Sequence, residues 1–230
     1  ADGLVYTDGI AAEADGDAYF AEVFMNRIYK VTAEGEVSLF DESTAGTKGL
    51  AIGPDGLLYA CRNLDAQIVR YSATGDIEVL LQGELSPVLD EKDNPGEFCN
   101  DIAINAEGEI WFTDRVNKRV IYLATDGSSR VVAEGFRPNG LQLLPDRQML
   151  VVTDSNKAVL HAFRIEQNRE LVELPDFFDP IRLPDLKPGQ SLTPLGPKAP
   201  GSDGLEVDSE GPLYLTTFYG IQVFDREGRN

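Results

Sequence analysis

The chain has 230 residues, and its 39 acidic against 20 basic residues give a formal net charge of −19 at pH 7. This acid excess argues against a nucleic-acid partner and against an anionic membrane surface, and it favours cation binding or a solvated surface. No apolar run approaches the roughly 18–20 residues that cross a bilayer. We therefore expect a soluble protein, either cytoplasmic or exported after removal of a signal peptide.

Five copies of one sequence unit make up the chain. Each copy opens with a similar triplet, whose first residue we call the anchor residue, and continues with an apolar strand, a turn rich in Asp and Gly, and a second strand. The triplets are Asp8-Gly9-Ile10, Lys48-Gly49-Leu50, Asn100-Asp101-Ile102, Asn139-Gly140-Leu141 and Asp203-Gly204-Leu205. The basic spacing is about 40 residues, which indicates a repeat architecture.

Each unit has room for four short strands. In the first unit we predict them at Gly9–Glu13, Asp17–Glu22, Asn26–Thr32 and Glu36–Phe40, and the second unit has equivalent turns. Four strands in about 40 residues is typical of a β-propeller blade. We predict a single all-β propeller domain over residues 1–230, with about five blade repeats and almost no helix.

Two spacings exceed the basic repeat. The extra residues fall at Gly83–Phe98 and Pro175–Gly201, and both segments lead into an anchor residue. Long connections at one face of a fold commonly form a binding site. We expect both insertions to form walls around the anchors, and the apolar residues of the second insertion to pack.

The fifth unit stops before its fourth strand, and a ring of blades must close to avoid exposed sheet edges. Either a sixth blade follows in the parent protein, or Leu4–Thr7 completes a ring of five.

The two cysteines leave the compartment open. Cys61 ends the second strand of unit two, and Cys99 lies just before the first strand of unit three. These positions share one face, so a contact is possible, but we expect two buried free thiols.

The anchor residues carry the best functional signal. First strands line the central channel of a propeller, so residues at their openings converge. Oxygen donors occupy four of the five positions, and Lys48 occupies the fifth. Oxygen ligands suit Ca²⁺ or, less well, Mg²⁺, whereas the single histidine, His161, argues against zinc. We predict one Ca²⁺ held by Asp8, Asn100, Asn139 and Asp203.

Three motifs resemble those of a known family. Phe98-Cys99-Asn100-Asp101-Ile102, Pro138-Asn139-Gly140-Leu141 and Ser202-Asp203-Gly204-Leu205 are similar to motifs of the gluconolactonase/regucalcin (senescence marker protein) family. That family contains calcium-dependent lactonases and is related to diisopropylfluorophosphatase and the paraoxonases. The resemblance implies a six-bladed propeller with calcium in its tunnel, bound by the same four residues. At the first position the family usually has Glu, so Asp8 would bind through water or shift the ion.

The resemblance and the anchor residues together suggest a metal-dependent lactonase or esterase. Calcium would polarise the carbonyl of a sugar lactone or related ester, and Asp203 or Asp8 would activate water. Lys48 would orient an anionic substrate or stabilise the oxyanion. Two alternatives remain: a non-catalytic calcium- or ligand-binding propeller, and a phosphotriesterase-like hydrolase.

Overall fold

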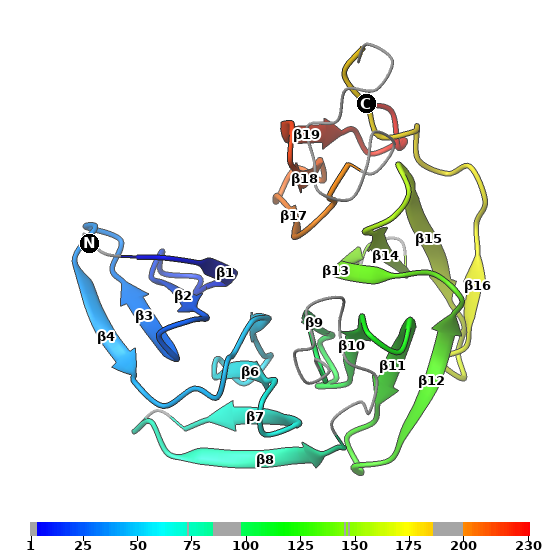
Figure 1. Cartoon of the computed structure of the whole chain (residues 1–230). Helices are drawn as coiled ribbons and strands as arrows, with labels where there is room; N and C mark the ends of the chain where they lie inside the picture. The colour runs from blue at the N-terminus through cyan, green and yellow to red at the C-terminus, as the bar shows by residue number, and fades with distance from the viewer. Residues whose placement is uncertain (1–3, 73, 85–97, 145, 147, 186–199) are drawn as a thin grey trace. The chain divides into compact units, whose positions relative to one another are not determined.

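A computed structural model of the chain describes residues 4–72, 74–84, 98–144, 146, 148–185 and 200–230. Strands β1 to β19 form five antiparallel sheets, and the described residues contain no α-helix (Figure 1). It follows that this part of the chain has no helix long and apolar enough to span a membrane.

Strands follow one another in chain order within each sheet. The first two sheets contain β1 (Thr7–Ala12), β2 (Ala18–Glu22), β3 (Arg27–Val31) and β4 (Val37–Asp41), then β5 (Leu50–Ile52), β6 (Leu58–Arg62), β7 (Gln67–Tyr71) and β8 (Ile77–Gln82). The third sheet contains β9 (Ile102–Ile104), β10 (Ile110–Asp114), β11 (Arg119–Leu123) and β12 (Ser129–Glu134). The last two contain β13 (Pro138–Leu144), β14 (Met149–Asp154), β15 (Leu160–Ile165) and β16 (Leu171–Glu173), then β17 (Leu205–Val207), β18 (Leu213–Thr217) and β19 (Gly220–Phe224).

The sequence repeat predicts these sheets well. All four strands expected in the first unit are present, with ends shifted by two residues or fewer. Four sheets have the four-stranded meander of a propeller blade, and the fifth has three strands among the described residues. The all-β, propeller-type fold with five blade repeats is confirmed. A six-bladed ring stays a prediction.

The chain divides into two compact units. The first contains Ala1–Asn117 and Ile121–Arg130, and the second contains Lys118–Val120 and Val131–Asn230. The first two sheets and most of the third belong to the first unit, and the last two sheets belong to the second. Each unit has its own apolar core.

Apolar side chains fill the space between neighbouring sheets in the first unit. Ile28 and Val69 lie in the cluster between the first two sheets, and Ile68 and Phe112 lie in the cluster between the second and third. All four side chains have no exposed surface, and burial of each contributes about 1.5–3 kcal/mol. Strands β10 and β14 are buried along their whole length, because central strands of a blade pack on both faces.

The core of the second unit includes part of an insertion. Val151 and Leu213 pack together with Phe178 and Ile181, which precede β17 in a segment without regular structure. The rings of Phe178 and Phe224 meet edge to face, with centroids 5.6 Å apart. The expected packing of this insertion is confirmed for its described part. Residues 85–97 and 186–199 lie outside the described residues. The prediction that both insertions form walls around the anchors falls mostly on these residues and stays a prediction.

Candidate functional site: the anchor residues

All five anchor residues lie at the opening of a first strand. Asp8 and Asn139 lie within β1 and β13, and Lys48, Asn100 and Asp203 each lie two residues before β5, β9 and β17. Three anchor amides donate to the carbonyl of the paired second-strand residue: Lys48 to Cys61 (3.3 Å), Asn100 to Thr113 (2.8 Å) and Asp203 to Thr216 (3.0 Å). The anchors therefore occupy equivalent backbone positions in their sheets.

Glycine after the anchor lets neighbouring first strands approach in the first unit. A Cβ on Gly9 would lie 1.8 Å from the carbonyl oxygen of Lys48, and one on Gly49 would lie 2.6 Å from the Cα of Asp101. The Gly49 amide also donates a 2.8 Å hydrogen bond to the carbonyl oxygen of Asn100. The first unit thus brings together the openings that carry Asp8, Lys48 and Asn100.

The second unit shows the same arrangement. A Cβ on Gly140 would lie 2.3 Å from the carbonyl oxygen of Asp203. The Asn139 side chain donates from Nδ2 to the carbonyl oxygen of Ser202 at 3.3 Å. Asn139 and Asp203 therefore belong to adjacent openings.

Most anchor side chains are partly buried. Asn100 is 6% exposed, and the other four anchors have intermediate exposure. The Asp8 carboxylate accepts a 2.9 Å hydrogen bond from the amide of Gly9. The donor set consists of two carboxylates and two carboxamides, whose oxygen atoms and two negative charges fit Ca²⁺. A common ion for all four residues stays a prediction.

Threonines on the second strands support the anchors, and sequence reasoning missed them. The hydroxyl oxygen of Thr113 accepts from the amide of Asp101 at 3.0 Å. The hydroxyl oxygen of Thr153 lies 3.3 Å from the carbonyl oxygens of both Gly140 and Asp203. Thr216 contacts the carbonyl oxygen of Gly204 at 3.1 Å. Threonine occupies the same place in the second strand of three repeats, and this recurrence was the sequence signal that could have identified these residues.

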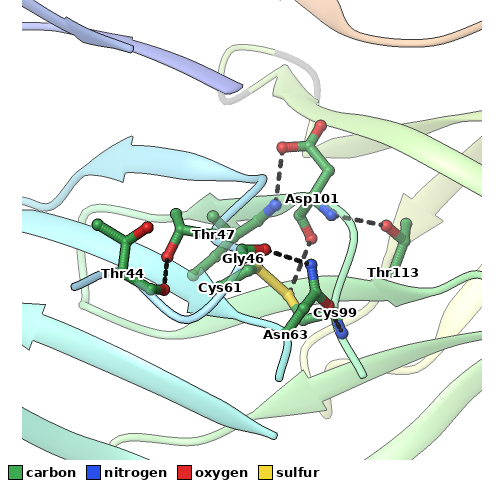
Figure 2. The surroundings of a disulfide bond; sticks show 9 residues. Thr44, Gly46, Thr47, Cys61, Asn63, Cys99, Asp101 and Thr113 are labelled. Carbon is green, nitrogen blue, oxygen red and sulfur yellow. Dashed lines mark hydrogen bonds between the residues drawn. A yellow bond between two sulfur atoms is a disulfide. The ribbon is translucent and has the colours of Figure 1, made fainter. Parts of the chain in front are cut away.

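The two cysteines form a disulfide, so the expectation of free thiols is wrong (Figure 2). The expectation failed because sequence spacing placed Cys61 and Cys99 on one face without showing that their Cα atoms approach to 5.4 Å. Both side chains are fully buried. The sequence separation of 38 residues gives a loop-closure stabilisation of about 4 kcal/mol.

His161 has structural partners in the second unit. Its Nδ1 lies 2.8 Å from Oε1 of Glu173, its Nε2 lies 3.7 Å from Oδ2 of Asp154, and its ring stacks on Phe136 with centroids 4.0 Å apart. Burial alone lowers the pKa of His161, but the two carboxylates outweigh burial and the pKa is raised. These contacts join β14, β15 and β16 within one sheet.

Three acids of the first turn are close enough to hold a metal ion. Ligand atoms of Glu13, Asp15 and Asp17 lie within 4.8 Å of one another. However, the ammonium of Lys30 lies 3.1 Å from Glu13 and 2.8 Å from Asp17 and already supplies a positive charge. Hydrogen bonds to Asp17 and Glu13 raise the pKa of Lys30. The turn follows the far end of β1 from Asp8, so this cluster is separate from the anchors.

A cavity of about 370 Å³ lies between the second and third sheets. Its lining includes Pro54 and Gly108, which belong to turns at the opposite end of the first strands from the anchors. The guanidinium of Arg70 in its wall pairs with Asp55 (2.9 Å) and Glu78 (2.5 Å). The cavity therefore does not coincide with the anchor residues.

Comparison with known proteins agrees with this architecture. A gluconolactonase from Zymomonas mobilis is 24% identical over 209 residues, covering 80% of this chain and 52% of the relative. The chain thus spans about half the length of that relative. A gluconolactonase structure from Xanthomonas campestris superposes with a TM-score of 0.78 at 25% identity, covering 99% of this chain and 75% of that one.

The calcium-binding protein regucalcin from Agrobacterium tumefaciens also has this fold, with a TM-score of 0.69 at 17% identity over 98% of this chain and 72% of that one. A family model, the SMP-30/gluconolactonase/LRE-like region, matches residues 6–230. Because this match covers nearly all of the residues, the chain belongs to the SMP-30/gluconolactonase/LRE-like family.

Proposed function

We propose that the chain is a calcium-dependent hydrolase that opens a sugar lactone or a related ester. The observation that carries this proposal is the occurrence of oxygen donors at four of five equivalent strand openings. Membership of a family that includes gluconolactonase supports the reaction class.

Asp8, Asn100, Asn139 and Asp203 are the proposed calcium ligands. Their backbones are held by strand pairing, and adjacent openings are in contact within each unit: Gly49 contacts Asn100, and Gly140 contacts Asp203. Such fixed positions reduce the ordering that ion binding requires. The proposal requires donors from both units to bind the same ion.

Calcium, when bound, supplies electrostatic polarisation of the lactone carbonyl and of the oxyanion that develops from it. The carboxylate of Asp203 accepts a proton from the attacking water, and the carboxylate of Asp8 is the alternative proton acceptor. The ammonium of Lys48 orients an anionic substrate or stabilises the oxyanion. Asn100 and Asn139 contribute neutral oxygen donors, which leaves the two aspartates to balance the ion's charge.

The direct test is hydrolysis of glucono-δ-lactone, corrected for the spontaneous reaction, with calcium and with a chelator. We expect the chelator to abolish turnover while the β-sheet circular dichroism is retained. Asp203→Asn should lower turnover and calcium affinity together, and Lys48→Met should lower turnover with little effect on calcium affinity. Asp15→Asn, in the separate acidic cluster, is the matched control and should leave both unchanged.

Three results would contradict the proposal. Chelator-sensitive binding without turnover of any lactone or ester would indicate a non-catalytic binding propeller. Turnover of a phosphotriester in place of lactones would indicate the phosphotriesterase-like activity. Lactone turnover that is insensitive to chelator would show that the reaction does not need the metal.

A further inference from the structure

The disulfide joins two segments that carry anchor residues. The amide of Cys61 donates to the carbonyl of Gly49 (3.0 Å), and the carbonyl of Cys61 accepts from the amide of Lys48 (3.3 Å). Cys99, its disulfide partner, immediately precedes Asn100. The covalent bond therefore connects the strand residue that holds one anchor to the residue before the next anchor (Figure 2).

The side chain of Asn63 adds a second link between the segment before Lys48 and the segment before Asn100. Its Nδ2 donates to the carbonyl of Gly46 (3.2 Å), and its Oδ1 accepts from the amide of Cys99 (2.9 Å). The Asn63 side chain is 5% exposed, so both hydrogen bonds are shielded from water. Figure 2 shows Asn63 between Gly46 and Cys99, next to the disulfide.

The backbone of Asn100 is held by hydrogen bonds to the neighbouring second sheet and to its own sheet. Its carbonyl accepts from Gly49 in the second blade (2.8 Å), and its amide donates to Thr113 in its own blade (2.8 Å). On its N-terminal side the chain arrives through a long connection from β8, which ends at Gln82. The Cys99 disulfide and the Asn63 hydrogen bond hold the end of this connection, together with the ring of Phe98, which packs against Phe112 with centroids 5.5 Å apart.

We propose that the Cys61–Cys99 disulfide and Asn63 are positioning residues for Asn100, so that calcium affinity depends on the oxidation state of the cysteines. This inference rests on the proposed function, because it takes Asn100 as a calcium ligand. Residues that orient metal ligands commonly change metal affinity by tenfold or more when altered. Loss of the two links lets Asn100 leave its position beside Gly49, and calcium binding must then fix Asn100 in place again.

The redox step balances with a dithiol reagent. Reduction breaks the Sγ–Sγ bond, and the two cysteines gain two electrons and two protons. Dithiothreitol supplies both and forms its own cyclic disulfide. Because both sulfurs are buried, we expect reduction of the folded protein to be slow.

The test uses two variants that remove different links: the double variant Cys61→Ser/Cys99→Ser, and Asn63→Leu. Hydrogen exchange in the calcium-free protein should become at least tenfold faster at the amides of Gly49 and Asn100. The amides of β3 in the first sheet should keep their protection. The calcium dissociation constant from calorimetry should rise about tenfold or more in both variants.

Leu58→Ala is the control for general destabilisation. Leu58 is 4% exposed and lies at the other end of β6 from Cys61, so this change lowers the melting temperature without touching the links. It should leave Gly49 and Asn100 exchange and calcium affinity unchanged. Equal loss of calcium affinity in the control and the two variants would overturn the proposal.

Two further results are decisive. Unchanged exchange at Gly49 and Asn100 in both variants would overturn the positioning role, and so would alkylation of two free thiols in the protein purified under oxidising conditions. If the wild-type protein binds no calcium, the proposed function and the redox-dependent affinity both fail. The exchange measurement would then still decide whether the disulfide and Asn63 position Asn100.

Discussion

The hydroxyl oxygen of Thr153 in β14 lies 3.3 Å from the carbonyl oxygen of Asp203, so a buried second-strand residue of one blade contacts the anchor of the next. The same hydroxyl lies 3.3 Å from the carbonyl of Gly140 in its own blade. One side chain thereby connects the openings of β13 and β17, which carry Asn139 and Asp203.

Thr153→Val should destabilise the protein by about 1–3 kcal/mol, because it removes a hydroxyl donor from the buried carbonyl of Gly140 and the partly buried carbonyl of Asp203. Thr216→Val is the matched control, since Thr216 is exposed and its hydroxyl contacts one carbonyl, that of Gly204, where the hydroxyl of Thr153 contacts two. Its effect should stay within about 0.5 kcal/mol. Denaturant unfolding measures both, and equal losses would contradict the role of Thr153.

Gly140→Ala should be strongly destabilising, by several kcal/mol, because the added methyl would overlap the backbone of Asp203 at 2.3 Å. Gly204 has the same place in its triplet, but its nearest neighbour to an added methyl is 3.8 Å away. Gly204→Ala should therefore be nearly neutral. If the two variants melt at the same temperature, close approach of the strand openings does not explain the glycine at this position.

Glu22→Gln should cost about 1–3 kcal/mol of stability without changing calcium affinity. The carboxylate is 1% exposed and accepts from the amides of Tyr6 (2.9 Å), Val5 (3.3 Å) and Met25 (2.6 Å). The substitution replaces one carboxylate oxygen with an amide nitrogen, which cannot accept a hydrogen bond from these backbone amides. Glu34→Gln on the surface is the control. A large fall in calcium affinity in Glu22→Gln would contradict a purely structural role.

His161 should make stability depend on pH. The carboxylates of Asp154 and Glu173 raise the folded-state pKa of His161 against the opposing effect of burial. Its protonation therefore contributes stability that is complete below the unfolded pKa of about 6.5 and is lost as the pH rises through the folded pKa. The difference in unfolding free energy between wild type and His161→Gln should shrink over that range. A difference that is constant with pH would contradict this ion pairing.

Local patterns in the sequence were enough to predict the sheets. Turns such as Ala14-Asp15-Gly16 and apolar runs such as Ile110-Trp111-Phe112 specify strands and their ends from neighbouring residues alone. The equivalent placement of the five anchors follows from the same repeat.

Contacts between distant segments could not be predicted in this way. The Cys61–Cys99 bond depends on the register of β6 and on how closely the second and third blades approach. The contact of Thr153 with Asp203 spans 50 residues and depends on the approach that Gly140 permits. Sequence spacing reports neither the register nor the distance between sheets.

The most direct test of the central claim is a crystal structure of the protein grown with calcium. We predict one ion with side-chain oxygens of Asp8, Asn100, Asn139 and Asp203 at about 2.3–2.6 Å. These side chains lying more than about twice that distance from a common point, or calcium bound instead at Glu13, Asp15 and Asp17, would contradict the account.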